Sequence, residues 1–201
     1  PLATGDAIGC TVDYMQGRNR YIAHLIASCG FVERELDPDV FGFLVRSIIT
    51  QQISNKAALT VVGRMREKFP HMEAASIAAA TDAEIQSIGI SMRKVSYIRG
   101  LCEAVLHGSL VIDELNKMSD QEVAQKLLPI KGIGQWTVEM TLIFSLGRGD
   151  VVSFGDYAIR KGMMTLYGLK ELNRVAFERY RKRYSPYGTV ASIYLWEAAV
   201  L

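Results

Sequence analysis

Residues 128–137 have the sequence LPIKGIGQWT, in which a helix end, a tight turn with two glycines and a new helix start follow one another. Glycines two positions apart let the backbone approach a ligand and leave amides open at a helix N-terminus, which favours a phosphate. Lys131 adds a positive charge beside the turn. A dinucleotide-binding fingerprint is excluded, because it needs a preceding strand and a third glycine where Thr137 stands. A phosphate-binding turn and a plain helix–helix turn both remain open.

Helical patterns dominate the rest of the chain. Apolar residues within 41–49 recur at the spacing of a buried helix face, and Thr81 and Ser119 each begin a Ser/Thr-x-x-Glu capping box. Further helices are predicted over residues 20–29, 55–69, 91–107, 135–145, 157–167, 171–184 and 186–200. Only residues 111–112 and 151–152 have the pattern of short extended segments. We therefore predict an all-α protein with about nine to eleven helices.

The composition is that of an ordinary globular protein. The chain has 201 residues, of which 49% are hydrophobic and 22% charged, enough to bury the core of one domain or two small ones. No apolar run reaches the roughly 18 residues that span a bilayer, and the first residues lack a secretory signal pattern. We therefore expect an intracellular protein, in the cytoplasm or nucleoid or in a nucleus, that does not insert into membranes. The net charge of +2 permits a polyanionic partner without requiring one.

The three cysteines, Cys10, Cys29 and Cys102, are widely spaced and have no histidines at ligand spacing. Neither a disulfide framework nor a zinc site is therefore expected. Buried free thiols are the simplest interpretation.

A second informative segment follows the hairpin. An apolar helix is followed by GRGD at residues 147–150 and by VVSFGDY at residues 151–157, so Asp156 stands just before a predicted helix. This order of hairpin, helix, extended segment, aspartate and helix resembles the helix-hairpin-helix DNA glycosylases, whose catalytic aspartate follows the hairpin. Residues 46–54, with the sequence RSIITQQIS, resemble the wedge loop of that family. Residues 89–98 and the pair Pro186–Tyr187 resemble further family segments, and the resemblance covers residues 21–201.

The identity of the residue just after the hairpin distinguishes two mechanisms within this family. Members that also cut the DNA strand carry a lysine there, which forms a Schiff base with the sugar, whereas this chain has Trp136. Lys131 precedes the glycines and does not take that place. The chain is most similar to the bacterial 3-methyladenine DNA glycosylase II branch, which has a tryptophan at this position. The resemblance implies a monofunctional base excision repair enzyme that hydrolyses the N-glycosidic bond of alkylated purines, such as 3-methyladenine and 7-methylguanine, in DNA.

Asp156 is the predicted catalytic residue. Cleavage of the N-glycosidic bond builds positive charge on the sugar, which a fixed carboxylate stabilises, whereas a simple helix N-cap is the alternative role. By resemblance, Trp136, Tyr157 and Tyr187 line the base pocket and stack on a cationic base, although aromatic residues near helix starts are also common in cores. Met140 and Tyr187 stand where the bacterial enzyme has tyrosine and tryptophan. A less aromatic pocket with narrower selectivity is therefore expected.

The predicted DNA contacts come from the wedge loop and the hairpin. Gln52 takes the wedge position, where a side chain fills the gap left by an extruded base, and a solvated loop residue is the alternative. The hairpin residues expected to bind DNA are Lys131, Gly132, Ile133, Gly134, Gln135 and Thr137. A basic run either faces phosphates or forms a solvated helix face. Its residues are Arg174, Arg179, Arg181, Lys182 and Arg183.

The mechanism implied by the resemblance requires no cofactor. In relatives, hairpin carbonyls hold a monovalent cation, Na⁺ or K⁺, and the corresponding residues are Leu128, Ile130 and Ile133. Relatives with an iron–sulfur cluster carry four closely spaced cysteines after the last helix. The last cysteine of this chain is Cys102, so no cluster is expected.

The resemblance also implies two helical subdomains with the active site in the cleft between them. Residues 40–148 would form a central bundle with the wedge loop and the hairpin, and residues 1–39 with 149–201 would form the second subdomain. The expected partner is double-stranded DNA containing a damaged base, bound by a monomer. Two alternatives stay open: a glycosylase of the same fold for oxidised, deaminated or mismatched bases, and a non-enzymatic helix-hairpin-helix DNA-binding protein.

Overall fold

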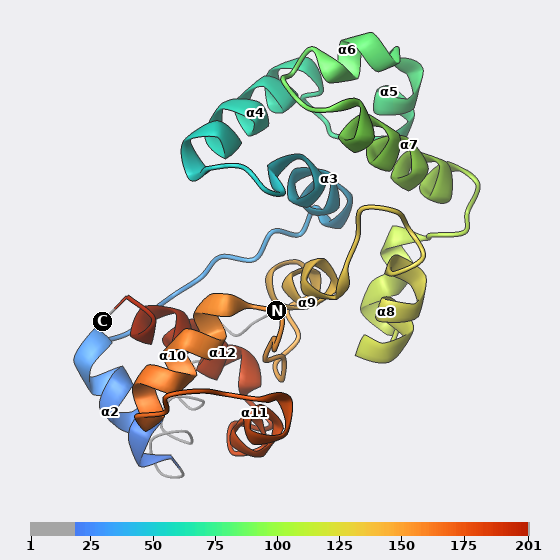
Figure 1. Ribbon diagram of the computed structural model, residues 1–201. Coiled ribbons are helices and arrows are strands. Elements are labelled where there is room, and N and C mark those ends of the chain that lie inside the picture. The colour runs from blue at the N-terminus through green and yellow to red at the C-terminus, as the bar shows by residue number, and fades with distance from the viewer. Residues whose placement is uncertain (1–18, 201) are drawn as a thin grey trace. The chain divides into compact units, whose positions relative to one another are not determined.

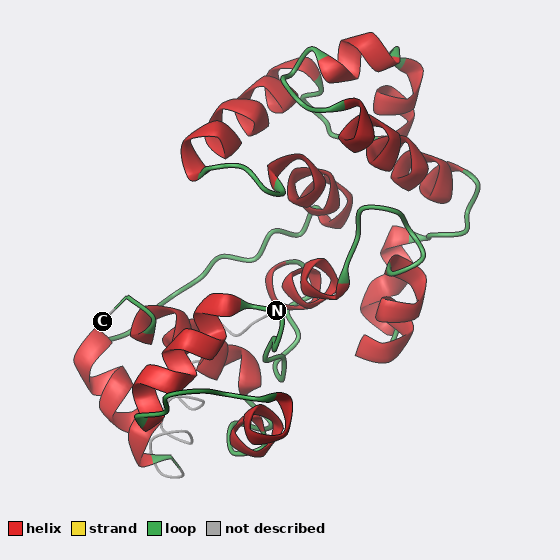
Figure 2. Ribbon diagram, viewed as in Figure 1, coloured by secondary structure: helices red, strands yellow, loops and turns green. Residues whose placement is uncertain are grey.

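The structure, a computed structural model, describes residues 19–200 and consists of helices and loops (Figure 2). Within that range there are eleven α-helices, one 3-10 helix and no strand, which confirms the predicted all-α class. No helix among these residues is long and apolar enough to cross a membrane.

The described residues form two compact units. Unit 1 contains residues 19–36 and 142–200, and unit 2 contains residues 37–141. The helices of unit 1 are α2 (Arg20–Cys29), α10 (Tyr157–Tyr167), α11 (Arg174–Arg181) and α12 (Gly188–Ala198). Those of unit 2 are α3 (Val40–Thr50), α4 (Asn55–Lys68), α5 (Ala74–Ala79), α6 (Asp82–Gln86), α7 (Met92–Leu106), η1 (Ile112–Lys117) and α8 (Asp120–Leu127). The helix α9 (Gln135–Phe144) begins in unit 2 and ends in unit 1, so this boundary lies within a helix and not at residue 148.

Unit 2 is built around α7, against which α3, α5 and α6 pack (Figure 1). Its fully buried side chains include Leu44, Ile48, Met65, Ile77, Ile98 and Leu101. The capping boxes predicted at Thr81 and Ser119 are confirmed, and they begin α6 and α8. The helix α5 lacks a local start signal and is not predicted, because Glu73 at its N-cap makes no side-chain capping bond. The extended segment predicted at residues 111–112 is wrong at Ile112, which begins η1.

Unit 1 packs α2, α10 and α12 around one core (Figure 1). Ile159 and Met163 of α10 meet Tyr194 and Leu195 of α12 in that core. Two predicted helix starts are wrong in this unit. The helix α11 begins at Arg174 and not at residue 171, because the Asn173 side chain accepts the Ala176 amide as an N-cap. The helix α12 begins at Gly188, because Tyr187 occupies the N-cap position with a non-helical backbone.

The helices α10 and α12 come into backbone contact at Gly162, where an added Cβ would overlap the carbonyl oxygen of Leu195. We expect Gly162→Ala to lower the free energy of unfolding by about 3 kcal/mol, because overpacking a filled core costs this much when the backbone must shift. Urea denaturation measures the loss. Gly100→Ala is the matched control, since a Cβ at that helical position meets nothing within 4 Å. An unchanged urea midpoint for Gly162→Ala would show that α10 and α12 are not in backbone contact at this position.

Candidate DNA-binding and catalytic site

The hairpin of unit 2 links α8 to α9 through residues 128–134. Two backbone hydrogen bonds close the turn, from the Ile130 amide to Leu127 O at 3.1 Å and from the Ile133 amide to Ile130 O at 3.0 Å. The Ile130 and Ile133 side chains are buried and anchor the turn in the core. Gly132 has a φ of 91°, and a Cβ there would lie 2.5 Å from Cδ2 of Tyr97. Only glycine therefore fits at this position.

The outer face of the hairpin is accessible. Lys131, Gly134 and Gln135 are exposed, whereas the side chains of Ile133 and Thr137 are buried. Of the residues predicted to bind DNA, the last two can therefore contribute only backbone groups. An added Cβ at Gly134 would meet no atom within 4 Å, so open space lies above this glycine. The turn thus exposes two polar side chains and the backbone of Gly134.

The wedge loop of unit 2 follows α3 and is tied to its surroundings through polar bonds. Gln51 Nε2 donates to Gly132 O at 2.7 Å, which joins the loop directly to the hairpin. Lys94 Nζ donates to Ile49 O at 2.9 Å and to Gln51 O at 2.7 Å. Partial burial lowers the pKa of this lysine. The next residue, Gln52, is exposed and has a φ of 57°, a left-handed conformation that is uncommon outside glycine.

Asp156 lies in unit 1, where it caps the N-terminus of α10. Its Oδ1 accepts the Ile159 amide at 2.9 Å and the indole Nε1–H of Trp196 at 3.2 Å. Its own amide donates to Ser153 Oγ at 3.2 Å. The N-cap role that the sequence left open is therefore real. Capping engages Oδ1, and Asp156 as a residue is half-buried.

The segment that leads to Asp156 is held by the start of α12. The Asp150 carboxylate accepts the Gly188 amide at 3.0 Å and the Ser185 hydroxyl at 2.7 Å. The Val151 amide donates to Thr189 Oγ1 at 3.1 Å, and Val151 O accepts the Ser192 hydroxyl at 2.8 Å. Side chains thus replace a strand partner for the extended segment predicted at residues 151–152. Sequence reasoning missed these partners, since the bonds join residues more than thirty positions apart.

Trp196 is the other residue of this site that sequence reasoning missed. Its ring stacks on that of Phe144, with centroids 5.6 Å apart and planes inclined by 19°. A tryptophan near the end of an apolar helix is most simply interpreted as core. No local pattern could have indicated its contact with Asp156, which lies forty positions earlier in the chain.

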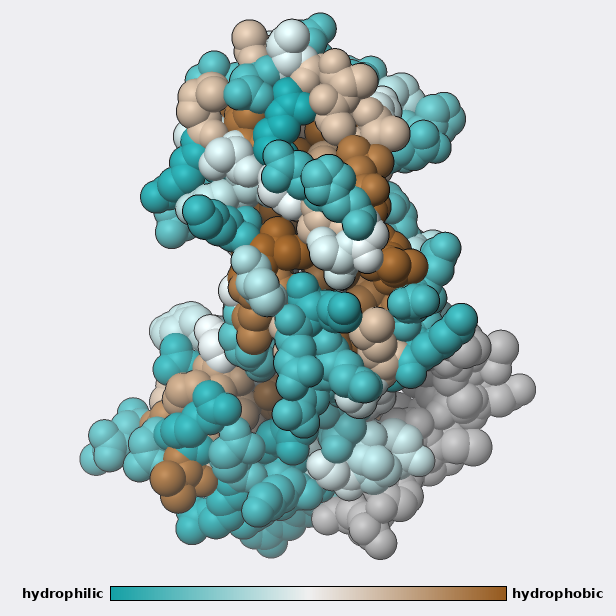
Figure 3. Space-filling model, turned by 90° about the vertical axis from the view of Figure 1, so that its right-hand side faces the viewer, coloured by the Kyte–Doolittle hydropathy of each residue, from teal (hydrophilic) through white to brown (hydrophobic). Residues whose placement is uncertain are grey.

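The predicted base-pocket residues are divided between the units. In unit 2, Trp136 is 44% exposed and Met140 is 3% exposed. In unit 1, Tyr157 is 68% exposed and Tyr187 is half-buried beside the core. Core packing, the alternative considered for the aromatic residues, is therefore wrong for Trp136 and Tyr157. On the face that Figure 3 shows, apolar areas are interspersed with hydrophilic side chains.

Much of the basic run makes structural contacts within unit 1. Arg174 pairs with Glu178 at 3.1 Å and lies over the Phe154 ring. Arg181 donates to Asp150 O at 3.2 Å. The guanidinium groups of Arg179 and Arg183 lie over the Tyr180 ring at 5.4 and 4.8 Å. Phosphate contact by this run stays a prediction.

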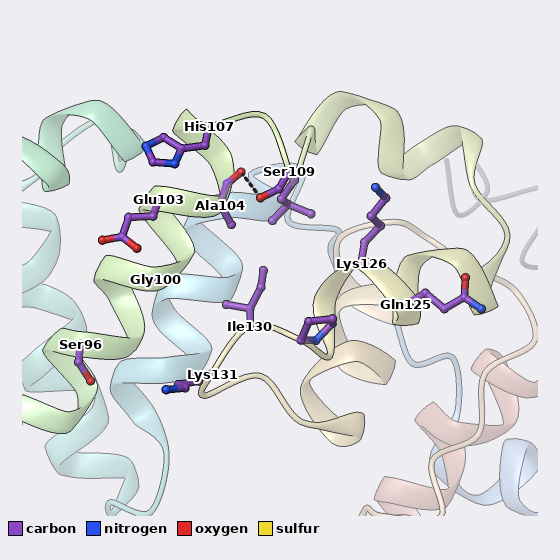
Figure 4. Close-up of a pocket in the computed structure, with 12 residues that line it drawn as sticks. Ser96, Gly100, Glu103, Ala104, His107, Ser109, Gln125, Lys126, Ile130 and Lys131 are labelled. Carbon is purple, nitrogen blue, oxygen red and sulfur yellow. Dashed lines mark hydrogen bonds between the residues drawn. The ribbon is translucent and has the colours of Figure 1, made fainter.

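An open pocket of about 530 Å³ lies in unit 2 (Figure 4). It is bordered by Glu103 of α7 and His107 just after it, by Lys126 of α8 and by the hairpin residues Ile130 and Lys131. None of the predicted base-pocket residues lines it. It is therefore not the predicted base pocket.

Neither a metal cluster nor a reactive thiol is evident in residues 19–200. These residues contain no group of three or more His, Cys, Asp or Glu side chains that could hold a metal ion. Cys29 and Cys102 are free thiols, and burial raises the pKa of Cys102 to about 11. Cys10 lies outside the described residues.

Comparison with known proteins identifies the family. A model of the HhH-GPD superfamily of base excision DNA repair proteins matches residues 45–186. The chain belongs to the HhH-GPD superfamily. Its helix-hairpin-helix glycosylase fold, expected from the hairpin and from Asp156, is thereby confirmed.

Relatives in this superfamily cover most of the chain. DNA-3-methyladenine glycosylase 1 of Schizosaccharomyces pombe is 34% identical over 166 residues, which are 79% of this chain and 72% of that protein. The crystal structure of a DNA-3-methyladenine glycosidase from Bacillus halodurans superposes with a TM-score of 0.84 at 38% identity, covering 94% of this chain and 88% of that one. The S. pombe 3-methyladenine DNA glycosylase in complex with abasic DNA gives a TM-score of 0.84 at 28% identity, covering 95% and 97%.

Proposed function

We propose that this chain is a monofunctional DNA glycosylase that removes alkylated purines, of the 3-methyladenine and 7-methylguanine type, from double-stranded DNA. The observation that carries the proposal is the fixed carboxylate of Asp156, which accepts two N–H groups from two helices in a HhH-GPD chain. The relatives named as 3-methyladenine DNA glycosylases support the substrate class. Trp136 at the position of the Schiff-base lysine supports the monofunctional mode.

Asp156 would act on the sugar. Breaking the bond between C1′ and the base nitrogen leaves the sugar with oxocarbenium character, and a nearby carboxylate lowers the energy of that state. Water then adds its oxygen to C1′, and its proton leaves to solvent. The bond electrons leave with the base. A base that is methylated at a ring nitrogen is already cationic, so it departs as a neutral molecule without protonation.

The aromatic side chains would select the base by its charge. A cationic ring gains energy over the face of an aromatic ring, and Trp136 and Tyr157 are both exposed for such contact. Tyr187 would supply a third ring. Met140 adds apolar area without a ring, so we expect narrower selectivity than a fully aromatic pocket would give.

DNA would be held by the hairpin and opened by the wedge loop. Amides at the exposed turn and the charge of Lys131 suit a phosphate, and the positive φ of Gln52 presets an exposed side chain for the gap left by an extruded base. A monovalent cation on the carbonyls of Leu128, Ile130 and Ile133 is compatible with the turn. Ile130 O already accepts the Ile133 amide, but a carbonyl has a second lone pair for a cation.

The test compares substrates and reaction products. Duplexes with single 3-methyladenine, 7-methylguanine or hypoxanthine lesions are incubated with the chain, and strands are analysed with and without alkali. We expect breaks only after alkali, no covalent complex after borohydride reduction, and unequal rates on the three lesions. Breaks without alkali, or a trapped complex, would contradict the monofunctional mode. Equal rates would contradict narrow selectivity.

The Lys94 ammonium joins α7 to the wedge loop. Lys94→Met keeps the aliphatic stem and removes both bonds to backbone carbonyls, so we expect a loss of about 2 kcal/mol in unfolding free energy and slower base extrusion. Urea denaturation and the fluorescence of 2-aminopurine beside the lesion measure the two effects. Lys68→Met is the control, because its ammonium bonds to the Ser87 side chain on the surface and not to the wedge loop. Equal unfolding free energies and equal extrusion rates in the two variants would contradict a role for Lys94 in holding the loop.

A further inference from the structure

The indole of Trp196 and the carboxylate of Asp156 form a contact between two helices of unit 1. Trp196 lies on α12, and its Nε1–H points to Oδ1 of Asp156 at 3.2 Å. Asp156 caps α10, and the same oxygen accepts the Ile159 amide at 2.9 Å. Two donors from two different helices therefore converge on one oxygen atom.

The two donors fix different degrees of freedom of the carboxylate. The Ile159 amide belongs to the helix that Asp156 caps, so it holds Oδ1 at the N-terminus of α10. Rotation of an aspartate carboxylate about its Cβ–Cγ bond is otherwise broad. The indole N–H approaches from α12 and limits this rotation. Together they set the plane of the carboxylate.

The indole is held by a ring stack and by the packing of its helix against α10. Its ring stacks on Phe144, and Leu195, the residue before it, touches Gly162 of α10 through the backbone. This close contact fixes the distance between α10 and α12 at the level of the indole. The donor therefore has little freedom to follow a carboxylate that turns away.

We propose that Trp196 is a positioning residue that holds the Asp156 carboxylate in the orientation required for catalysis. The inference rests on the proposed function, in which Asp156 stabilises charge at C1′. An indole suits this task because it donates one hydrogen bond and carries no charge. A lysine or arginine at the same place would orient the carboxylate as well. Its positive charge, however, would weaken the stabilisation that the negative carboxylate gives to the positive charge on the sugar.

Trp196→Phe tests the proposal, because it removes the N–H and keeps a ring for the stack on Phe144. We expect single-turnover base release to fall about tenfold, equivalent to about 1.4 kcal/mol. The affinity for abasic duplex DNA and the melting temperature should stay near those of the wild type. Tyr194→Phe is the matched control on the same helix. It removes the hydroxyl that donates to Gly30 O and should affect stability only.

A second measurement does not depend on activity or on the folding of a Trp196 variant. The chain has two tryptophans, so its ¹⁵N–¹H spectrum contains two indole signals. We expect the Trp196 signal to move upfield in Asp156→Asn, because the acceptor loses its charge, and to stay in place in the exposed control Glu171→Gln. Wild-type release by a folded Trp196→Phe, or an unmoved indole signal in Asp156→Asn, would overturn the proposal. If the wild-type chain released no alkylated base, the proposed function would fail, and the indole signal would still decide whether the contact exists.

Discussion

Asp156→Asn is expected to slow the release of alkylated bases by about a hundredfold to a thousandfold, the usual effect of removing one preorganised electrostatic group. The substitution keeps the shape of the side chain and its carbonyl oxygen, so the Ile159 amide and the Trp196 indole retain an acceptor. Asparagine is also as good an N-cap as aspartate. The change therefore removes the negative charge and little else. Single-turnover release from a duplex with one lesion measures the loss.

Two controls separate chemistry from folding in that experiment. The melting temperature and the affinity for abasic duplex DNA should both match the wild type. Asp150→Asn provides a comparison at a carboxylate that accepts the Gly188 amide at the start of α12 but is not assigned to the sugar. Equal losses of rate in the two variants would mean that Asp156 acts only through the structure of its segment.

Substitution by alanine is expected to affect different properties at the two hairpin glycines: stability at Gly132 and DNA affinity at Gly134. Gly132→Ala places a Cβ against Tyr97 at a φ of 91°, so the turn must distort and the melting temperature should fall by several degrees. Gly134→Ala meets no protein atom within 4 Å, so the fold should be unaffected. The added methyl group would occupy the space in which a phosphate approaches the turn. We expect its affinity for duplex DNA to fall about tenfold, as for the loss of a charge-assisted hydrogen bond.

Differential scanning fluorimetry and fluorescence anisotropy with a labelled duplex measure the two effects. Gly100→Ala is again the control, since it also has open space above its Cβ but lies outside the hairpin. Normal DNA affinity in Gly134→Ala would mean that this face of the hairpin does not approach the phosphate backbone.

Local signals in the sequence were sufficient to predict most helices. Thr81, Ser91 and Ser119 cap helices through their own side chains, and each bond joins residues three apart. Where such a signal was missing or misread, the prediction failed. The helix α5 has no side-chain cap, and the α11 boundary depended on Asn173, which was overlooked in favour of an earlier start.

The candidate site shows the same division between local and distant interactions. The spacing of Gly132, Gly134 and Asp156 lies within one stretch of chain and carries the family resemblance. The contacts that orient this stretch come from residues far away in sequence, such as Gln51 on Gly132 O and Trp196 on Asp156. These pairs follow no periodicity, because only the packing of helices brings them together.

Release of alkylated purines as free bases is the activity that we propose for this chain. Duplex DNA methylated on its purines would be incubated with the purified chain, and the released bases would be identified by chromatography. We expect free 3-methyladenine and 7-methylguanine, with intact strands until alkali is added. DNA that is bound without release of any alkylated base would contradict it, and would favour another lesion or a non-enzymatic DNA-binding role.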